Sequence, residues 1–420
     1  MFKRHLYPHI VESLRDFPAI LVSGARQVGK TTLVKSMMDD LPSAEYITLD
    51  DFSTLQSALN DPEKLLLTRA RPLIIDEVQM APILLTTIKK LIDENRKNGQ
   101  FILTGSANLM TFQKVSESLA GRIALFTLFP LSISEILGES GDFSFIHNAL
   151  GADSMISYLQ DCSDHLKNSS ITKDKIESLI LDGGYPEITK LHSQGSKQIW
   201  FDSYRKTYLE RDIRNLAKLE NINSFFNLVD ILASRQGSTV NKTELSRTLG
   251  LNFRTLDKYL ALLEMTFQII RLQPWLKNSA KRLVKSPKIY YTDSGFTSFL
   301  LGLQTSAELH HSPLKGKVTE TWVMAEIQKL INNMGDRSLK SYYYRTQSGS
   351  EIDCIVEKGS RIISIEIKSN SRVSMDDFRH IRALQSQTGS NFAMGIVLYP
   401  GNEVLSFGEK LAAIPFNILV

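Results

Sequence analysis

The segment Gly24–Thr31 combines glycines, a lysine and a hydroxyl side chain at the spacing needed to hold phosphate groups. Its sequence, GARQVGKT, fits the pattern G-x-x-x-x-G-K-[ST] at every position. Such glycines let backbone N–H groups close around phosphates at a helix N-terminus, while the lysine neutralises the β- and γ-phosphates and the threonine holds Mg²⁺. The ATP-binding residues expected from this pattern are Gly24, Ala25, Arg26, Gln27, Val28, Gly29, Lys30, Thr31 and Thr32.

Two carboxylates end the apolar segment LIIDE at residues 73–77. Asp76 would orient Mg²⁺ through its water shell, and Glu77 would position or activate the attacking water. Lys30 and Glu77 are therefore the expected catalytic residues, and Thr31 and Asp76 are the expected metal ligands. The alternatives, a glycine turn with an exposed lysine and two solvated acids at a strand end, are disfavoured because both features occur together in a strand–helix context.

Polar residues after the following apolar segments are candidates to complete this site. Thr104-Gly105-Ser106 ends one such segment, and either Thr104 or Ser106 could contact the γ-phosphate. Arg122 is a candidate arginine finger for the nucleotide, acting in the same chain or from a neighbouring subunit of a homo-oligomer. An arginine at a surface or at a helix end explains Arg122 equally well.

A second group of carboxylates lies in the segment 351–368, which is typical of a β-hairpin with a two-residue turn at 359–360. The residue numbers of two paired strand residues then sum to 719, so Asp353 lies opposite Glu366 on the face that also carries Lys368. Carboxylates about 5 Å apart repel each other unless a cation such as Mg²⁺ neutralises them. Asp353 and Glu366 are thus expected metal ligands, and Glu366 and Lys368 are expected catalytic residues. A solvated face balanced by Lys368 and nearby arginines is an equally good interpretation.

The helical pattern before this hairpin, at about 315–333, supplies one more acid. Glu320 or Glu326 could reach the same ion. Because they are six residues apart, they do not share a helix face, and at most one is expected to be a ligand.

Residues 240–256 are typical of two helices joined by a tight turn. Asn241 is expected to cap the first helix, Gly250 to end it, and Asn252 to cap the second. The second helix would expose Arg254, Thr255 and Lys258 near its start, where recognition helices contact DNA.

The segment 271–288 then carries six basic residues and no acidic one: Arg271, Lys277, Lys281, Arg282, Lys285 and Lys288. Phosphate contacts by such a cluster favour DNA as a partner of residues 252–288. The alternative is a winged helix that packs against proteins or serves as an ATPase lid.

The elements that position these side chains alternate along residues 1–140, where five β-rich segments are separated by helical patterns: 18–24, 45–50, 72–77, 100–106 and 123–129. This pattern predicts a parallel α/β sheet. The 420 residues are 42% hydrophobic and 22% charged, which excludes wholesale disorder. Two distant cysteines exclude a disulfide framework and a zinc cluster, and the absence of an apolar run of about 18 residues argues against a membrane span. A soluble, cytoplasmic protein is expected.

Several of these segments resemble those of a bacterial and archaeal family of AAA-type P-loop ATPases. The segments are GARQVGKTT, LIIDEVQ, LTGSANL, SLAGR, GGYPE, YLERDI, LGLNFRTLDKYLALLE, KSPKIYYTDSG, YRTQSGSEIDCIV and IEIKS. Members of that family carry a C-terminal domain of unknown function that is similar to PD-(D/E)XK nucleases. The resemblance implies ATP and Mg²⁺ as cofactors and a nuclease-type core of Glu320, Asp353, Glu366 and Lys368, with Glu320 preferred over Glu326.

The expected architecture is α/β throughout, with a P-loop parallel-sheet domain, a helical lid with a winged helix, and a C-terminal restriction-endonuclease-like domain. The expected boundaries are 1–150 for the ATPase domain, 151–235 for the helical lid or linker, 236–300 for the winged helix and 312–420 for the nuclease-like domain. The expected function is ATP binding and hydrolysis coupled to DNA through the winged helix and the C-terminal domain. The alternatives are a nucleotide-switched DNA-binding regulator and a protein-interaction scaffold, both without nuclease activity.

Overall fold

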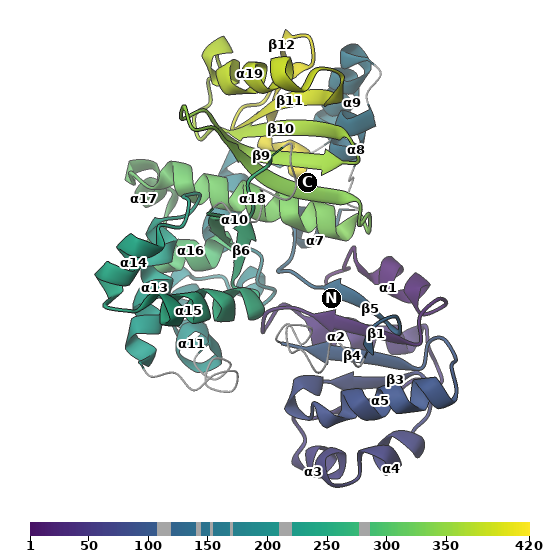
Figure 1. The fold of residues 1–420 in the computed structure, drawn as a ribbon. Helices are drawn as coiled ribbons and strands as arrows, with labels where there is room; N and C mark the ends of the chain where they lie inside the picture. Colours follow the sequence, from purple (N-terminus) through teal and green to yellow (C-terminus); the bar gives the residue numbers. More distant parts are fainter. Residues whose placement is uncertain (107–118, 140–143, 152–153, 169–170, 210–220, 277–285) are drawn as a thin grey trace.

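Two large sheets with helices around and between them form most of the α/β architecture of the described residues (Figure 1). The computed structural model describes residues 1–420 except 107–118, 140–143, 152–153, 169–170, 210–220 and 277–285. None of the helices in these described ranges is long and apolar enough to span a membrane.

The first sheet is entirely parallel, as predicted, and its strands have the order β2-β3-β4-β1-β5. The five strands confirm the five β-rich segments expected from the sequence, each shortened by two residues. They are β1 (Ala19–Ser23), β2 (Glu45–Thr48), β3 (Leu73–Asp76), β4 (Phe101–Gly105) and β5 (Ile123–Thr127). Because β4 lies between β1 and β3, the residue after β4 lies between the loop after β1 and the acids that end β3.

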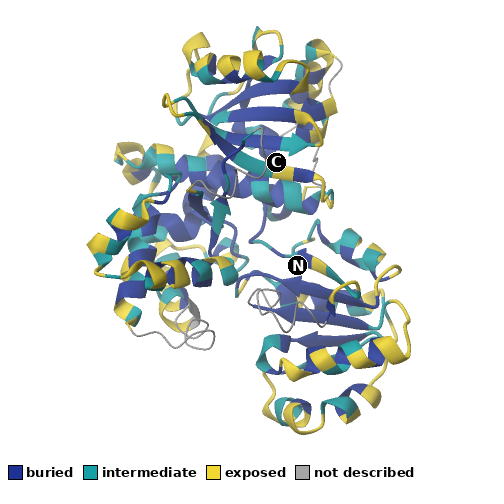
Figure 2. Ribbon diagram, in the orientation of Figure 1, coloured by how far each residue is buried: buried dark blue, intermediate teal, exposed yellow. Residues whose placement is uncertain are grey.

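Helices cover both faces of this sheet, so its central strands are buried (Figure 2). One face packs against three helices that follow β2 and β3, and the other packs against two helices near the start of the chain. The first set is α3 (Phe52–Asn60), α4 (Pro62–Leu67) and α5 (Ile83–Glu94); the second is α1 (Tyr7–Ser13) and α2 (Lys30–Ser36). After β5, the short helix α7 (Ile133–Leu137) leads the chain away from the sheet.

The middle of the chain is helical and contains one small antiparallel sheet of two strands, β6 (Ile269–Leu272) and β7 (Lys288–Tyr291). The helices are α10 (Lys173–Asp182), α11 (Gln194–Ser203), α13 (Ile222–Ser234), α14 (Lys242–Leu249), α15 (Phe253–Met265), α16 (Ser294–Leu300) and α17 (Ser306–His311). The predicted caps are confirmed: the Asn241 and Asn252 side chains accept N–H bonds in the first turns of α14 and α15, and Gly250 ends α14 with φ of 64°.

The C-terminal sheet has the order β12-β13-β11-β10-β9-β8 and mixes parallel with antiparallel pairs. Its strands are β8 (Leu339–Arg345), β9 (Glu351–Lys358), β10 (Arg361–Ile367), β11 (Phe392–Tyr399), β12 (Leu405–Gly408) and β13 (Leu411–Pro415). The helix expected at 315–333 is α18 (Lys315–Asn333), which covers one face. The other face packs against α19 (Arg379–Thr388), which the sequence analysis did not predict.

Two helices from earlier in the chain also pack on the C-terminal sheet. They are α8 (Ser144–Gly151) and α9 (Met155–Asn168), whose Phe145 and Tyr158 belong to one core cluster with Ile363 and Ile396. Figure 1 shows α8 and α9 beside β10 and β11, far from the parallel sheet. The chain therefore passes from the first sheet to the second and back before it forms the middle helices.

The predicted hairpin register is confirmed. Arg361 pairs with Lys358 and Ile365 with Cys354, so paired residues sum to 719. The turn at 359–360 begins with a glycine at φ of 61°. On the face that carries Asp353, the neighbouring Ile355 is buried under α19 rather than solvated. Only the end of this face that carries the carboxylates is left outside the apolar core.

Candidate functional site

The loop between β1 and α2 has the backbone geometry of a phosphate cradle. Gly29 has φ of 96° and Gln27 has φ of 64°, so the chain turns sharply before the helix begins at Lys30. A Cβ at Gly24 would lie 2.2 Å from the Leu128 carbonyl oxygen, so only glycine fits there. The Lys30 ammonium donates to the carbonyl oxygens of Gly24 (3.0 Å) and Ala25 (2.8 Å) and thus points into the loop.

Asp76 lies directly beside this loop and is held by three hydroxyl groups. Thr31 Oγ1 donates to Asp76 Oδ2 at 2.8 Å, Tyr46 Oη donates to the same oxygen at 2.9 Å, and Thr104 donates to Oδ1. Burial, together with this bond to Asp76, raises the pKa of Tyr46 above its usual value. A threonine hydroxyl and a fixed carboxylate at this distance fit the ligands that Mg²⁺ uses with a nucleotide.

Glu77 is positioned by Gln79, a residue that the sequence analysis did not single out. Gln79 Nε2 donates to the Glu77 carboxylate and also to Ser106 Oγ at 2.9 Å. The backbone N–H of Glu77 donates to Thr104 Oγ1 at 3.1 Å. The two candidates for a γ-phosphate contact therefore have different surroundings. The Thr104 hydroxyl donates to Asp76, whereas the Ser106 hydroxyl accepts from Gln79, which also binds Glu77. The sequence feature that could have indicated a role for Gln79 is its position two residues after Glu77 in the segment DEVQ.

A cavity of about 860 Å³ adjoins the loop. The N-terminal segment, the start of α2 and the segment after the Gly183-Gly184 turn line it, with side chains such as Arg4, Tyr7, Thr32, Leu33, Pro186 and Lys190. Its volume lies within the usual range of small-molecule sites, about 300–1,000 Å³. A nucleoside joined to phosphates in the loop would extend into this cavity.

Arg4, which the sequence analysis also did not predict, binds the backbone of the phosphate loop. Its guanidinium donates to the Val28 carbonyl at 2.7 Å and to the Phe129 carbonyl at 2.6 Å, and it pairs with Glu135 at 3.1 Å. The arginine thereby ties the phosphate loop to the segment between β5 and α7. No local pattern in the N-terminal sequence indicated this contact.

Arg122 does not lie at the phosphate loop of its own chain. It comes directly before β5, at the amino end of a parallel strand, whereas the loop follows the carboxyl end of β1. Its guanidinium pairs with Asp93 of α5 at 2.6 Å and donates to the Ala120 carbonyl at 2.9 Å. An arginine finger acting in the same chain is therefore contradicted, and only action on a neighbouring subunit stays a prediction.

The carboxylates of the C-terminal sheet surround a lysine that comes from β7. Lys288 Nζ lies 2.6 Å from Glu351 Oε1 and 3.6 Å from both Glu320 Oε1 and Asp353 Oδ1. Glu326 points elsewhere, to Lys329 and to the backbone N–H of Ile133. Of these two acids only Glu320 lies near the hairpin, and the expectation that at most one of them is a metal ligand stays a prediction.

Glu366 and Lys368 form a separate pair at the edge of this cluster, with Lys368 Nζ 3.1 Å from Glu366 Oε1. Burial and the nearby Asp353 raise the pKa of Glu366 to about 8, and burial with Asp353 raises that of Glu320 to about 7. Within the described ranges, no group of three or more His, Cys, Asp or Glu side chains is arranged to hold a metal ion. The predicted ion between Glu320, Asp353 and Glu366 therefore does not fit this arrangement, because Lys288 lies among the carboxylates.

The raised pKa of Glu366 predicts a pH-dependent cost to stability. A carboxyl with a folded-state pKa of about 8 and an ordinary value near 4.5 loses stabilisation as the pH rises between these two values. We expect the Glu366→Gln protein to melt at a higher temperature than wild type at pH 8. This difference in melting temperature should be larger at pH 8 than at pH 5 by at least about 2 °C. Thermal unfolding of both proteins from pH 5 to 8 measures this. A difference that is constant with pH would contradict the prediction.

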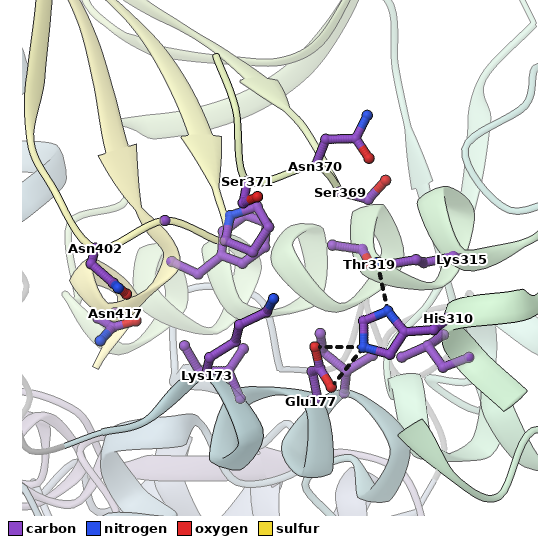
Figure 3. Close-up of a pocket in the computed structure, with 16 residues that line it drawn as sticks. Lys173, Glu177, His310, Lys315, Thr319, Ser369, Asn370, Ser371, Asn402 and Asn417 are labelled. Carbon is purple, nitrogen blue, oxygen red and sulfur yellow. Dashed lines mark hydrogen bonds and ion pairs between the residues drawn. The ribbon is translucent and has the colours of Figure 1, made fainter. Parts of the chain in front are cut away.

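A second cavity, of about 280 Å³, lies where α10, α17 and the start of α18 meet the loops that follow β10 and β11 (Figure 3). Lys315 donates to His310 Nδ1 at 2.9 Å, and His310 Nε2 lies 3.0 Å from Glu177. Because these three side chains satisfy one another, the cavity does not present the single-sign charge of a phosphate site.

The basic segment 271–288 is divided by the structure. Arg271 is partly exposed and pairs with Glu264, whereas Lys288 is buried among carboxylates and is not placed to contact DNA phosphates. The other four, Lys277, Lys281, Arg282 and Lys285, lie outside the described residues. Arg254 and Lys258 at the start of α15 are exposed as expected, whereas Thr255 is partly buried.

Comparisons with known proteins agree with the geometry of the phosphate loop. The family model of the AAA domain matches residues 16–137, which hold the loop, the parallel sheet and both acids at the end of β3. These residues form a P-loop domain of the AAA type. Two domains of unknown function, DUF8612 and DUF4143, match residues 173–307 and 315–419.

Similar full-length proteins come from bacteria and archaea. An uncharacterised protein of Mycobacterium tuberculosis is 27% identical over 98% of this chain and 83% of its own length. An uncharacterised protein of Methanocaldococcus jannaschii is 20% identical over 80% of this chain and 71% of its own length. Among solved structures, a Walker-type ATPase of Pyrococcus abyssi aligns at 15% identity over 72% of this chain and 96% of that one, with a TM-score of 0.45.

Proposed function

We propose that this chain binds and hydrolyses ATP and couples its nucleotide state to the placement of a DNA-binding module. One observation carries the ATPase part: the Lys30 ammonium points into the loop while Thr31 contacts the fixed carboxylate of Asp76 at 2.8 Å. The direct test is binding of a fluorescent ATP analogue and Mg²⁺-dependent release of phosphate by the purified chain. Failure of both would refute the proposal.

Each side chain of the site has a proposed task in hydrolysis. Lys30 would exchange its two carbonyl partners for oxygens of the β- and γ-phosphates. Thr31 and Asp76 would hold Mg²⁺, which when bound neutralises charge on those phosphates. Glu77 would accept a proton from the attacking water, with Gln79 setting the orientation of its carboxylate.

Contacts between the loop and the middle helices support coupling to nucleotide state. A Cβ at Gly29 would lie 3.9 Å from Pro186 Cγ, so Pro186 borders the phosphate loop. Two residues earlier, the Gly184 N–H donates to Asp293 at 2.7 Å, and Asp293 follows β7 closely. A nucleotide that shifted Pro186 would thereby act on the segment that holds β7.

A second set of contacts joins the AAA-type domain to α18. The Lys329 ammonium is buried, donates to the Leu131 carbonyl at 2.9 Å and pairs with Glu326 at 2.7 Å. Glu326 in turn accepts the Ile133 N–H at 3.0 Å. Because α18 also carries Glu320, one helix connects the nucleotide domain to the carboxylates of the C-terminal sheet.

The order of elements supports the finer domain proposals. Residues 222–291 run α13, an isolated bridge at Thr239, α14, α15, β6 and β7, which is the order of a winged helix. Residues 315–399 run α18, β8, β9, β10, α19 and β11, the order of a PD-(D/E)XK nuclease core. We propose that the first module contacts DNA and that the second adds to the binding surface without cleaving while Lys288 stays among its carboxylates.

DNA binding by α15 predicts a charge-reversal effect. We expect Arg254→Glu with Lys258→Glu to weaken binding of duplex DNA at least about tenfold and to make its salt dependence shallower, because two phosphate contacts are lost. Fluorescence anisotropy from 50 to 200 mM salt measures both quantities. The matched control, with the same change of net charge, is Lys64→Glu with Lys97→Glu, which replaces two exposed lysines of the AAA-type domain. Equal losses in both proteins, or none in either, would favour a protein-binding role for the module.

A further inference from the structure

Lys288 is a charged residue at the start of a buried strand. All four residues of β7 are buried, and the Lys288 side chain is only 1% exposed. Its backbone is fixed on both sides, because it pairs with Leu272 of β6 and bridges to Thr239. The side chain therefore leaves a rigid strand and enters the C-terminal domain.

Three carboxylates from two different elements converge on the Lys288 ammonium. Glu320 comes from α18, and Glu351 and Asp353 come from β9, at 3.6, 2.6 and 3.6 Å from Nζ. The hydroxyl of Tyr290, two residues further along β7, donates to Glu320 at 2.5 Å. One segment of the middle module thus supplies both a cation and a hydrogen-bond donor to the acidic cluster.

An ammonium and a divalent ion cannot share this position. Mg²⁺ requires oxygen ligands at about 2.0–2.1 Å, and the carboxylate oxygens here already surround a nitrogen atom at contact distance. A buried ammonium is stable only when carboxylates pair with it.

The lysine is also part of a larger contact between the middle module and β8. The backbone after β6 pairs with β8, since the Tyr343 N–H donates to the Gln273 carbonyl at 3.0 Å. Trp275 Nε1 donates to Glu357 at 2.9 Å, and Tyr343 Oη donates to the Ser286 carbonyl at 2.6 Å. These bonds hold the segment around Lys288 against the C-terminal sheet.

We infer that Lys288 is the resident cation of the carboxylate cluster and excludes a divalent metal ion from it while β7 is docked on the C-terminal domain. The lysine takes the position that a metal would occupy between Glu320, Glu351 and Asp353. This inference goes beyond the proposed ATPase function and does not depend on it, because the loop that binds nucleotide is a separate site.

The test measures binding of Mn²⁺ alone to the full chain by electron paramagnetic resonance, without nucleotide. All proteins carry Asp76→Asn, which removes the carboxylate proposed to hold Mg²⁺ beside the phosphate loop, so that this site does not contribute. Lys288→Met is compared with Lys288→Arg, which keeps the cation, and with Lys288→Met combined with Asp353→Asn. We expect Lys288→Met to bind one Mn²⁺ at least about tenfold more tightly than the protein with Lys288, and the other two variants to lose this gain.

Two outcomes would overturn the inference. One is a Lys288→Met protein that folds and gains no Mn²⁺ site, and the other is a protein with Lys288 that binds Mn²⁺ at a site removed by Asp353→Asn. Lys288→Met leaves three buried carboxylates without a cation and could fail to fold. The comparison with Asp353→Asn in the presence of Lys288 then decides: absence of an Asp353-dependent Mn²⁺ site supports the inference.

Discussion

Replacing Lys30 with alanine is expected to weaken ATP binding roughly 100-fold and to remove hydrolysis. The ammonium is almost completely buried and donates two hydrogen bonds inside the loop, at 3.0 and 2.8 Å, where phosphate oxygens would replace the carbonyl groups. A hydrogen bond to a charged group contributes about 1.5–3 kcal/mol, and the upper value corresponds to about two orders of magnitude in affinity. Titration of a fluorescent ATP analogue measures the loss.

The fold of the Lys30→Ala protein is expected to persist, because the core of the parallel sheet is apolar and does not involve this side chain. Circular dichroism and thermal unfolding check this. Lys64→Ala is a matched control, since Lys64 is an exposed helical lysine away from the loop and its cavity. Retained ATP affinity in Lys30→Ala, or an equal loss in Lys64→Ala, would contradict the assignment of the loop.

Features set by neighbouring residues could be predicted from the sequence. The phosphate loop follows from one motif, and the boundary between α14 and α15 follows from Asn241, Gly250 and Asn252, whose capping depends on the residues beside them. The register of the β9–β10 hairpin follows from its two-residue turn, because the turn fixes every later pair. In each case the sequence signal and the structural feature lie within a few residues of each other.

Features set by contacts between distant segments could not be predicted in this way. Lys288 was assigned to a basic patch because its neighbours along the chain are basic, yet its partners are 32 to 65 residues away. The signal was present in the segment KIYY, where a lysine opens an apolar strand. The direction of β5 would likewise have placed Arg122 away from the loop, since residues before a parallel strand lie opposite to those after it.

The contacts of α18 would give the proposed coupling between nucleotide and carboxylates a physical route. At one part of this helix, Lys329 binds the Leu131 carbonyl and Glu326 accepts the Ile133 N–H. This segment is tied to the phosphate loop by Arg4, which donates to Val28, and to the segment before Pro186 by the Leu131 N–H, which donates to Gly184. At another part Glu320 accepts the Tyr290 hydroxyl and lies beside Lys288. A shift of the loop segment would therefore act on β7 by two routes, one through α18 and one through Asp293. Release of Lys288 would be the step at which nucleotide state reaches the acidic cluster.

Replacing Glu77 with glutamine is expected to leave ATP binding within about threefold of wild type while lowering the hydrolysis rate at least about 100-fold. Removal of a general base lowers a rate by about 10²–10⁴, whereas glutamine keeps the size of the side chain. Lys30 and Thr31 donate hydrogen bonds to Gly24, Ala25 and Asp76, none of which is changed, so we expect these binding contacts to stay intact. Phosphate release at saturating ATP measures the rate, and the fluorescent analogue measures binding.

The decisive comparison for Glu77 is with Gln79→Ala. Gln79 donates to Glu77 and to Ser106, so its loss should misorient the carboxylate and lower the rate less than Glu77→Gln does. Glu94→Gln, a solvent-exposed acid at the end of α5, controls for the loss of one negative charge in the same domain. Hydrolysis that survives Glu77→Gln would assign the base to another residue. A rate lost equally in Gln79→Ala would mean that the amide contacts the reacting groups directly, because a group that only orients Glu77 cannot matter as much as Glu77 itself.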